Sequence, residues 1–177
     1  LYVSIGDRSE GGFAQDPSRF EGKILRMHDD GRAPADNPYS GQGATQNLVY
    51  AIGVRNPQGL YFDPVSDRLF EAEHGPMGGD EVNVIEAGAN YGWPDVSHGL
   101  NYTWQPFPQG TSKAGTRQPL FHYTPSRGLS SIEMYRGPMF PEWEGDLLVG
   151  ALRGHNLSRL DLDGDVGRRS HRPRMPR

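Results

Sequence analysis

Apolar residues along this chain occur in short runs that alternate with polar residues, and most runs end in residues that favour turns. Residues 1–7 read as a strand that ends in a Gly-Asp turn, and residues 20–27 read as another that ends at Asp29-Asp30-Gly31. No stretch of useful length repeats apolar residues at the three- and four-residue spacing of an amphipathic helix. The pattern therefore predicts an all-β fold.

The remaining strands and loops follow from the same pattern. Further strands are expected at 48–53, 60–62, 68–72, 81–85, 132–135, 146–151 and 157–162. The strands at 60–62 and 68–72 form a hairpin across the turn residues 63–67. Residues 30–47 and 90–118 are predicted as long loops, which are usually functional in a compact domain.

Two stretches share one pattern, in which an apolar entry is followed by a turn and a second strand. They read GLYFDPVSDRLFEAE at 59–73 and MFPEWEGDLLVGAL at 139–152. Short strands at this spacing are typical of a sandwich, a barrel or a propeller. Repeated phrases of this kind mark the blades of a propeller, so the sequence favours that architecture.

Composition excludes several functions. The chain has 177 residues, the size of one domain or of part of a larger one, with 24 Gly and 15 Pro. It has no cysteine, which excludes disulfides, zinc-thiolate sites and thiol catalysis. The net charge of -4 gives no general attraction to nucleic acid. No apolar run approaches the roughly 18 residues of a membrane helix, and GxSxG, P-loop and HExxH motifs are absent.

Arg55 and Asn56, in the stretch VRNPQGL, follow a predicted strand and precede a proline turn. Such loops present side chains at the rim of a β scaffold. The planar donor fork of Arg suits carboxylates. The alternative is a turn with a surface ion pair.

The stretch EHGPMGGDEVN at 73–83 gathers His74, Asp80 and Glu81 beside the kinked Gly75-Pro76 pair. Calcium binds carboxylate and carbonyl oxygens, and a Gly-Pro kink can point successive carbonyls outward. The alternative is a polar loop capped by acids. A second acidic stretch, DLDGD at 161–165, lacks the downstream Glu of a calcium loop and is interpreted as a strand turn.

Aromatic and basic residues also occur in the predicted loops. The stretch NYGWP at 90–94 and Tyr102 can stack on a planar ligand or a sugar ring, or can plug the end of a blade. Arg153, Gly154 and His155 end a predicted strand and can bring basic groups to the same rim.

Together these stretches resemble the soluble quinoprotein glucose/sorbosone dehydrogenase family, especially its bacterial aldose sugar dehydrogenase branch. The matching text is LYVSIGD at 1–7, GKILRM at 22–27, PADNPY at 34–39, RNPQGLYFDP at 55–64, EHGPMGGDEVN at 73–83, GANYGWP at 88–94 and FPEWEGDLLVGALRG at 140–154. The resemblance implies a six-bladed β-propeller, of which residues 1–166 would form roughly three blades. Residues 167–177 form a basic tail that does not match the family, and no strand is expected in it.

The resemblance also implies an activity. The family binds pyrroloquinoline quinone (PQQ) and calcium, and it oxidises the anomeric hydroxyl of aldoses to lactones, with hydride passing to PQQ. Arginines and a divalent cation suit a cofactor that carries three carboxylates and an ortho-quinone. The resemblance further implies an external electron acceptor and a periplasmic or secreted location.

The resemblance assigns roles to individual residues. The implied PQQ contacts are Arg55, Asn56, Tyr102 and Arg153 with Gly154 and His155. The implied calcium ligands are the carbonyls of Gly75 and Pro76 for a catalytic ion, and Glu81 with the Tyr91 carbonyl for a structural ion. Asp7 resembles the acid that orients the catalytic His.

The sequence departs from the family in three places. The family's catalytic His falls before Leu1, the text at 167–177 differs, and SRGLSS at 126–131 differs where substrate contacts are expected. We therefore expect the isolated chain to be inactive. Two other functions remain open: a calcium-dependent β-propeller lactonase or esterase, and a non-catalytic carbohydrate-binding propeller. Against the lactonase or esterase, the RNPQGL and EHGP stretches have no hydrolytic role, whereas quinone binding explains both.

Overall fold

A computed structural model describes residues 1–162 and 170–171 of the chain. The strands are β1 (Tyr2–Ile5), β2 (Lys23–Arg26), β3 (Val49–Ile52), β4 (Pro57–Asp63), β5 (Arg68–Glu73), β6 (Asp80–Ile85), β7 (Phe121–Tyr123), β8 (Leu129–Met134), β9 (Leu147–Ala151), β10 (Asn156–Leu160) and β11 (Ser170–His171). Short 3-10 helices span Gly11–Gln15, Gln46–Leu48 and Pro141–Trp143. No helix in the described part of the chain is long and apolar enough to cross a membrane.

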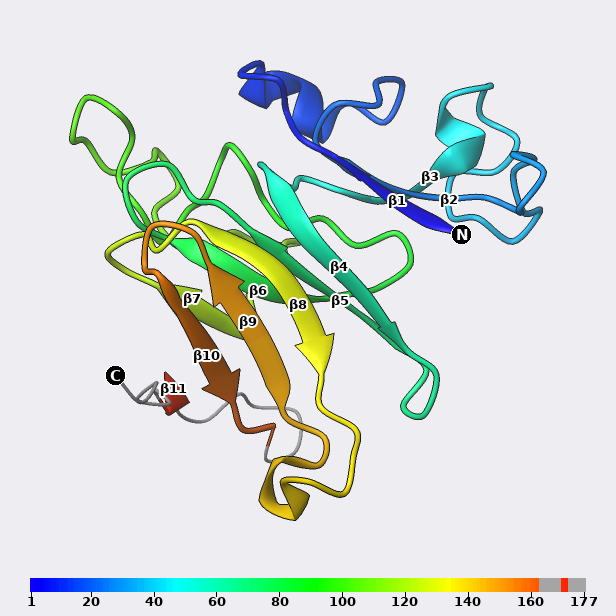
Figure 1. The fold of residues 1–177 in the computed structure, drawn as a ribbon. Helices are drawn as coiled ribbons and strands as arrows, with labels where there is room; N and C mark the ends of the chain where they lie inside the picture. Colours follow the sequence, from blue (N-terminus) through cyan, green and yellow to red (C-terminus); the bar gives the residue numbers. More distant parts are fainter. Residues whose placement is uncertain (163–169, 172–177) are drawn as a thin grey trace.

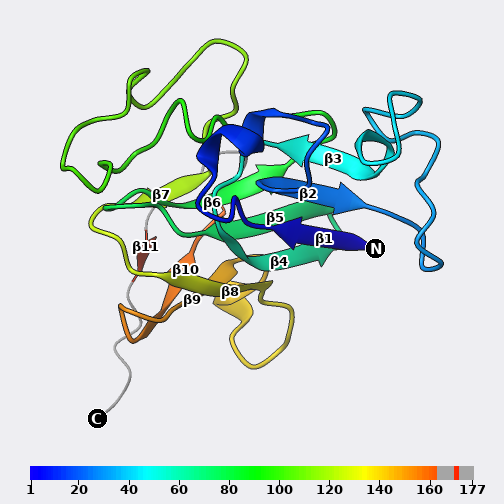
Figure 2. The same ribbon diagram turned by 90° about the horizontal axis from the view of Figure 1, so that it is seen from above.

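The strands form three antiparallel sheets that follow one another along the chain. Their strand orders are β1-β2-β3, β4-β5-β6-β7 and β8-β9-β10-β11. Each sheet is a meander, and the three sheets pack face to face like successive blades (Figure 1). Figure 2 shows the sheets from above, with the first strands β1, β4 and β8 following one another along one side.

The second and third sheets approach each other closely at their first strands. A Cβ atom on Gly59 of β4 would lie 2.5 Å from the Ser130 carbonyl oxygen and 2.9 Å from the Ile132 nitrogen, both in β8. Both neighbouring atoms belong to the backbone, which has little room to move. A glycine at this point therefore lets the two blades pack at this separation.

Apolar side chains fill the two spaces between the sheets. Because successive residues of a strand point to opposite faces, β5 contributes to both cores. Phe70 and Ala72 pack in the core shared with the third sheet, while Leu69 packs in the core shared with the first. Glu71 and Glu73 lie on the same face as Leu69, so this face of the second sheet combines apolar residues with buried acids.

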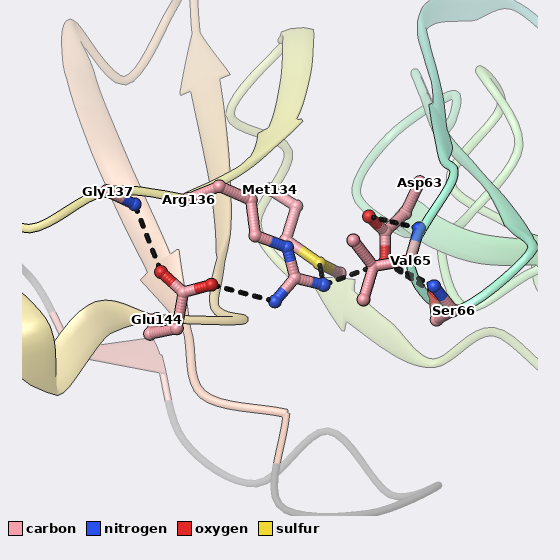
Figure 3. Close-up of polar contacts among 7 residues, drawn as sticks. All are labelled: Asp63, Val65, Ser66, Met134, Arg136, Gly137 and Glu144. Atoms are coloured by element: carbon pink, nitrogen blue, oxygen red, sulfur yellow. Dashed lines mark hydrogen bonds and ion pairs between the residues drawn. The ribbon is translucent and has the colours of Figure 1, made fainter.

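A polar network connects the second and third sheets at the end of β4 and β8 (Figure 3). Arg136 donates from Nη2 to Asp63 Oδ2 at 2.8 Å and from Nη1 to Glu144 Oε1 at 3.1 Å. The buried Asp63 also accepts the Ser66 backbone amide at 3.1 Å. The Arg136 guanidinium thus joins the β4–β5 turn to the β8–β9 loop.

Most strands lie close to where the sequence predicted them, although several differ. The strand β7 falls in a segment for which no strand was predicted, and β4 begins at Pro57 rather than at residue 60. The two repeat phrases do not cover equivalent strands. Residues 59–73 cover β4 and β5, but residues 139–152 cover a 3-10 helix and β9. The strands equivalent to β4 and β5 in the third sheet are β8 and β9.

The predicted tail falls mostly outside the described residues. Of residues 167–177, the structure describes Ser170–His171, which pair with Arg159 and Leu160 of β10. The expectation that no strand occurs in this segment was therefore wrong. The proposed boundary at residue 166 lies outside the described residues.

We expect the substitution Gly59→Val to lower the free energy of unfolding by about 1–3 kcal/mol, the usual cost of overfilling a packed site. Its side chain would meet the β8 backbone, so the second and third sheets would have to separate. Urea unfolding measures the effect. Gly12→Ala is the control, since a Cβ there meets no atom within 4 Å. Equal stability of the two variants would contradict the close approach.

Candidate functional site

Most of the predicted site residues lie on loops that precede or follow strands, whereas Glu81 lies within β6. The loops before β4, after β5 and after β9 are at the upper end in Figure 1. In an antiparallel meander, the start of the first strand, the end of the second and the start of the third share one end of the sheet. Arg55 and Asn56 precede β4, Gly75 and Pro76 follow β5, and Arg153 follows β9. The topology alone therefore gathers these loops.

Arg55 is the residue around which the site is built. Its Nη1 donates to the carbonyl oxygens of His74 at 2.8 Å and Gly75 at 3.2 Å. Its Nη2 donates to the Tyr102 hydroxyl at 2.8 Å. The guanidinium carbon also lies 5.2 Å from the centre of the Trp93 ring, within the range of cation–π attraction. The structure therefore brings together Arg55, Gly75 and Tyr102.

One nitrogen of the Arg55 guanidinium has no acceptor among the described residues. Within the part of the chain that the structure describes, Arg55 Nε is buried and has no hydrogen-bond partner. A buried N–H of a charged group without an acceptor is costly. An anionic ligand group such as a carboxylate would satisfy it.

Glu73 holds the backbone of the Arg55-Asn56 pair. Its Oε2 accepts the Arg55 amide at 2.5 Å and the Asn56 amide at 3.2 Å. The Arg55 carbonyl oxygen in turn accepts the Asp7 amide at 2.8 Å. Asn56 itself keeps its side chain beside the strand, where Oδ1 accepts Gln58 Nε2 at 2.9 Å.

Asp7 lies beside Arg55 and contacts Trp93. Trp93 Nε1 donates to Asp7 Oδ2 at 2.7 Å, and the Ser9 amide donates to Oδ1 at 3.0 Å. Arg8 and Ser9 have φ values of 55° and 67°, a left-handed conformation that non-glycine residues rarely adopt. Backbone strain of this kind clusters at functional sites, which agrees with the position of Asp7.

The loop that carries Trp93 is fixed to the first sheet. Gln15 Nε2 donates to the Trp93 carbonyl at 2.6 Å, and Gln15 Oε1 accepts Asn90 Nδ2 at 2.7 Å. The helix that contains Gln15 is held by the buried Lys23, whose Nζ donates to three backbone carbonyls. Burial lowers the pKa of Lys23 to about 8.

The loop at 74–79 points backbone carbonyls at the cationic side chain of Arg55. A Cβ on Gly75 would lie 2.1 Å from the Gly78 carbonyl oxygen, so this turn requires glycine. The carbonyls of His74 and Gly75 converge on one cationic nitrogen of Arg55. A divalent cation that prefers oxygen ligands could bind carbonyls of this loop, and the family resemblance implies one at Gly75 and Pro76.

A largely apolar cavity of about 550 Å³ adjoins this loop. Its lining includes Pro76, Met77, Trp104, Phe107 and Arg153. The cavity thus brings Pro76 and Arg153 together, although their loops belong to different sheets. Its size and its mixture of flat apolar walls with a cationic side chain suit a planar anionic ligand.

Other predicted site residues are less closely connected to Arg55. Gly154 and His155 lie in the exposed β9–β10 turn, where the Gly154 amide donates to the Arg127 carbonyl at 2.9 Å. Tyr91 packs in the core between the first and second sheets, and its hydroxyl donates to the Val84 carbonyl at 2.6 Å. Glu81 lies opposite Glu73 in the β5–β6 ladder.

Within residues 1–162 and 170–171, no three His, Cys, Asp or Glu side chains are grouped so as to hold a metal ion. The strand turn expected at DLDGD includes Asp163 and Asp165, which lie outside the described residues.

Three buried acids form a cluster on the face of the second sheet that packs against the first. Glu71, Glu73 and Glu81 share this face with Asn83, whose Nδ2 donates to Glu71 Oε2 at 3.0 Å. Burial raises the pKa of Glu71 and Glu81 well above their usual range, and the neighbouring Glu73 raises both further. Burial also raises the pKa of Glu73 to about 7, although the Arg55 and Asn56 amides oppose the shift.

Sequence reasoning missed the roles of Glu73, Trp93 and Asp80. Asp80 Oδ1 accepts the Gly75 amide at 3.0 Å, so the alternative of a polar loop capped by acids describes this residue correctly. The position of Glu73 at the end of a strand was visible in the sequence. Its partners were not, because they lie 17 and 18 residues earlier in the chain.

Comparison with known proteins identifies relatives over almost the whole chain. Residues 1–175 match the family model described as glucose/sorbosone dehydrogenase. The chain is 36% identical over 167 residues to aldose sugar dehydrogenase YliI of Escherichia coli, a match that covers 93% of this chain and 45% of that protein.

Solved structures of sugar dehydrogenases also superpose on this chain. A crystal structure of a glucose dehydrogenase superposes with a TM-score of 0.92 at 41% identity, covering 97% of this chain and 50% of that one. The PQQ-bound form of an aldose sugar dehydrogenase from Streptomyces coelicolor superposes with a TM-score of 0.75 at 31% identity, covering 97% and 45%. The predicted all-β partial propeller is confirmed. The chain spans about half the length of these relatives.

We expect Glu71→Gln to stabilise the protein at pH 8 by about 1 kcal/mol or more, the scale of one pKa unit. The pKa of folded Glu71 exceeds its ordinary value of 4.5, so the folded state retains a proton that the unfolded chain releases above that pH. The protonated Glu71 carboxyl therefore imposes no cost on folding at low pH, and the free energy of unfolding falls as pH rises above 4.5. Gln is neutral throughout and keeps the shape of the side chain.

Urea unfolding at pH 5 and pH 8, without divalent cations, measures this effect. The gain should be small at pH 5. The control is Glu133→Gln in β8, an exposed carboxylate that should change little at either pH. A destabilised Glu71→Gln variant at pH 8 would show that the acidic cluster is instead favourable when ionised.

Proposed function

Because the chain belongs to the glucose/sorbosone dehydrogenase family, we propose that it forms the PQQ- and calcium-binding half of a sugar dehydrogenase. The substrate would be an aldose, oxidised at its anomeric hydroxyl to a lactone, and electrons would leave to an external acceptor. The observation that carries this proposal is the environment of Arg55. One guanidinium lies among two carbonyls, a tyrosine and a tryptophan, with Nε still without an acceptor.

The arrangement supports PQQ as the ligand. Arg55 Nε and the guanidinium of Arg153 would bind carboxylates of the cofactor. Tyr102 is exposed and bonded to Arg55, so its ring is available at the edge of a bound planar group. The cavity beside Pro76 and Arg153 has space for a fused-ring molecule.

The loop at 74–76 supports calcium beside that cofactor. The carbonyls of Gly75 and Pro76 would bind the ion, and Arg55 would yield part of its contact with Gly75. We also propose a second, structural calcium at Glu81 and the Tyr91 carbonyl. There the buried carboxylate of Glu81, whose pKa is raised by burial, would gain a cationic partner.

When bound, PQQ and calcium would supply the electrophilic quinone chemistry that takes up hydride from an anomeric carbon. The protein's own groups bind and orient. Arg55 and Arg153 hold negative charge, and Glu73 fixes the backbone that aims Arg55. Asp7 accepts two hydrogen bonds, and a carboxylate has lone pairs for about four, so it retains capacity to orient a basic His.

The same family membership supports a periplasmic or secreted location for the protein. It also supports a small-molecule substrate rather than nucleic acid. Both are proposals about the whole protein, of which this chain spans part.

A titration of the chain with PQQ, with and without calcium, tests the proposed function. We expect calcium-dependent binding that changes the quinone absorbance. Addition of an aldose then tests for sugar oxidation, which would bleach the quinone absorbance. A folded chain that binds sugar with calcium but never PQQ would instead support the carbohydrate-binding alternative.

We expect Arg55→Lys to weaken PQQ binding by roughly 10- to 100-fold, since charge-assisted hydrogen bonds contribute about 1.5–3 kcal/mol. Lysine keeps the charge but lacks the planar fork and Nε. The matched control is Arg32→Lys, which alters an exposed ion pair with Asp30 away from the site. Unchanged PQQ affinity in Arg55→Lys, measured by the same titration, would remove Arg55 from the cofactor site.

A further inference from the structure

Asp80 is a buried carboxylate that contacts two separate loops of the site. It is the first residue of β6 and has no exposed surface. Its Oδ1 accepts the Gly75 amide at 3.0 Å, and its Oδ2 accepts the amides of Arg127 at 2.8 Å and Gly128 at 2.7 Å. One side chain therefore links the β5–β6 loop to the β7–β8 loop.

On one side, Asp80 fixes the direction of a carbonyl in the cation-binding loop. The Gly75 amide and the His74 carbonyl belong to one planar peptide group and point in opposite directions. Holding the amide on Asp80 therefore aims the His74 carbonyl, which accepts Arg55 Nη1 at 2.8 Å. The next two carbonyls along the chain belong to Gly75 and Pro76, and they are the proposed calcium ligands.

On the other side, Asp80 fixes the turn that carries Arg153. The Gly128 amide shares a planar peptide group with the Arg127 carbonyl, which accepts the Gly154 amide at 2.9 Å. The Gly128 carbonyl accepts the Leu152 amide at 2.8 Å. The residues on both sides of Arg153 are thus hydrogen-bonded to the segment that Asp80 holds.

We propose that Asp80 is a positioning residue that couples calcium binding at Gly75 and Pro76 to PQQ binding at Arg153. This inference rests on the proposed function and adds a coupling between its two ligands. Asp80 touches neither ligand. It transmits the position of the carbonyl loop to the β9–β10 turn through backbone hydrogen bonds, so that ordering one loop favours the binding geometry of the other.

The substitution Asp80→Asn breaks this link while keeping the shape of the side chain. A carboxylate accepts hydrogen bonds at both oxygens, whereas an amide has one acceptor oxygen and one NH₂ donor. Either Gly75 or the Arg127–Gly128 pair then loses its acceptor. The two loops can no longer be held by the same group.

Asp63→Asn is the matched control. Asp63 is also fully buried, starts a turn and accepts backbone amides, those of Val65 at 3.4 Å and Ser66 at 3.1 Å. It lies at the opposite end of β4, in the network with Arg136 (Figure 3). Both variants lose one buried acceptor, but Asp63 has no contact with the loops of the site.

The experiment measures calcium affinity by calorimetry without PQQ, and PQQ affinity with and without calcium, in the wild-type chain and both variants. Urea unfolding of each accompanies the titrations. In the wild type, calcium should strengthen PQQ binding by a factor in the range of about 5 to 150 that is usual for coupled sites. Asp80→Asn should bind calcium about tenfold more weakly, the scale expected when a group that orients a metal ligand is lost, and should lower that factor several-fold. Asp63→Asn should lose stability and keep the wild-type factor.

A wild-type coupling factor in Asp80→Asn, or an equal loss of coupling in Asp63→Asn, would overturn the inference and leave the proposed function intact. A folded wild-type chain that binds neither ligand would overturn both. If Asp80→Asn does not fold, hydrogen exchange on the wild-type chain decides instead. Calcium alone should then slow exchange of the Arg127, Gly128 and Gly154 amides, and unchanged exchange there would overturn the inference.

Discussion

The site depends on one buried constraint: the backbone and guanidinium of Arg55 are hydrogen-bonded to three different loops at once. Glu73 holds its amide, Asp7 binds its carbonyl, and His74, Gly75 and Tyr102 accept its side chain. A guanidinium offers five donors in a rigid plane, so the oxygens of His74, Gly75 and Tyr102 that accept from it must lie close to that plane. Displacing any one loop would leave a charged donor or a buried acceptor unsatisfied.

The second sheet makes this constraint possible because it is buried on both faces. Its apolar face packs on the third sheet through Phe70, Ala72 and Val82. Its other face carries three glutamates toward the first sheet, where burial raises the pKa of each. Charged groups in such a position cost stability unless they are paired. Burial therefore favours the neutral, protonated form of these carboxyl groups.

Backbone amides are the main partners of the buried acids in this structure. Glu73, Asp80 and Asp63 each accept two or more backbone amides from a turn or loop. A carboxylate with two acceptor oxygens can join two loops that share no strand pairing. Loops held in this way can carry ligand-binding groups with the precision of the strands beside them.

Much of the fold was predictable from the sequence by itself. Alternating apolar residues located almost every strand, because the two-residue period of a strand is a local property, and the missed β7 has just three residues. The stretches RNPQGL and EHGPMGGDE identified the loops that carry Arg55 and Gly75, because their unusual local composition needs no tertiary information. The family resemblance rested on the same local text.

The tertiary structure alone decided which of these residues meet. Glu73 contacts the Arg55 amide, Trp93 contacts Asp7 across 86 residues, and Asp80 contacts Gly128 across 48. Contacts at such separations depend on how the blades pack, and no local pattern in the chain encodes them. The Tyr91 side chain packs in the core between the first and second sheets, with its hydroxyl on the Val84 carbonyl, a contact that also depends on this packing. The sequence thus determined the strands, the loops and the family, and blade packing decided which loop residues share one site.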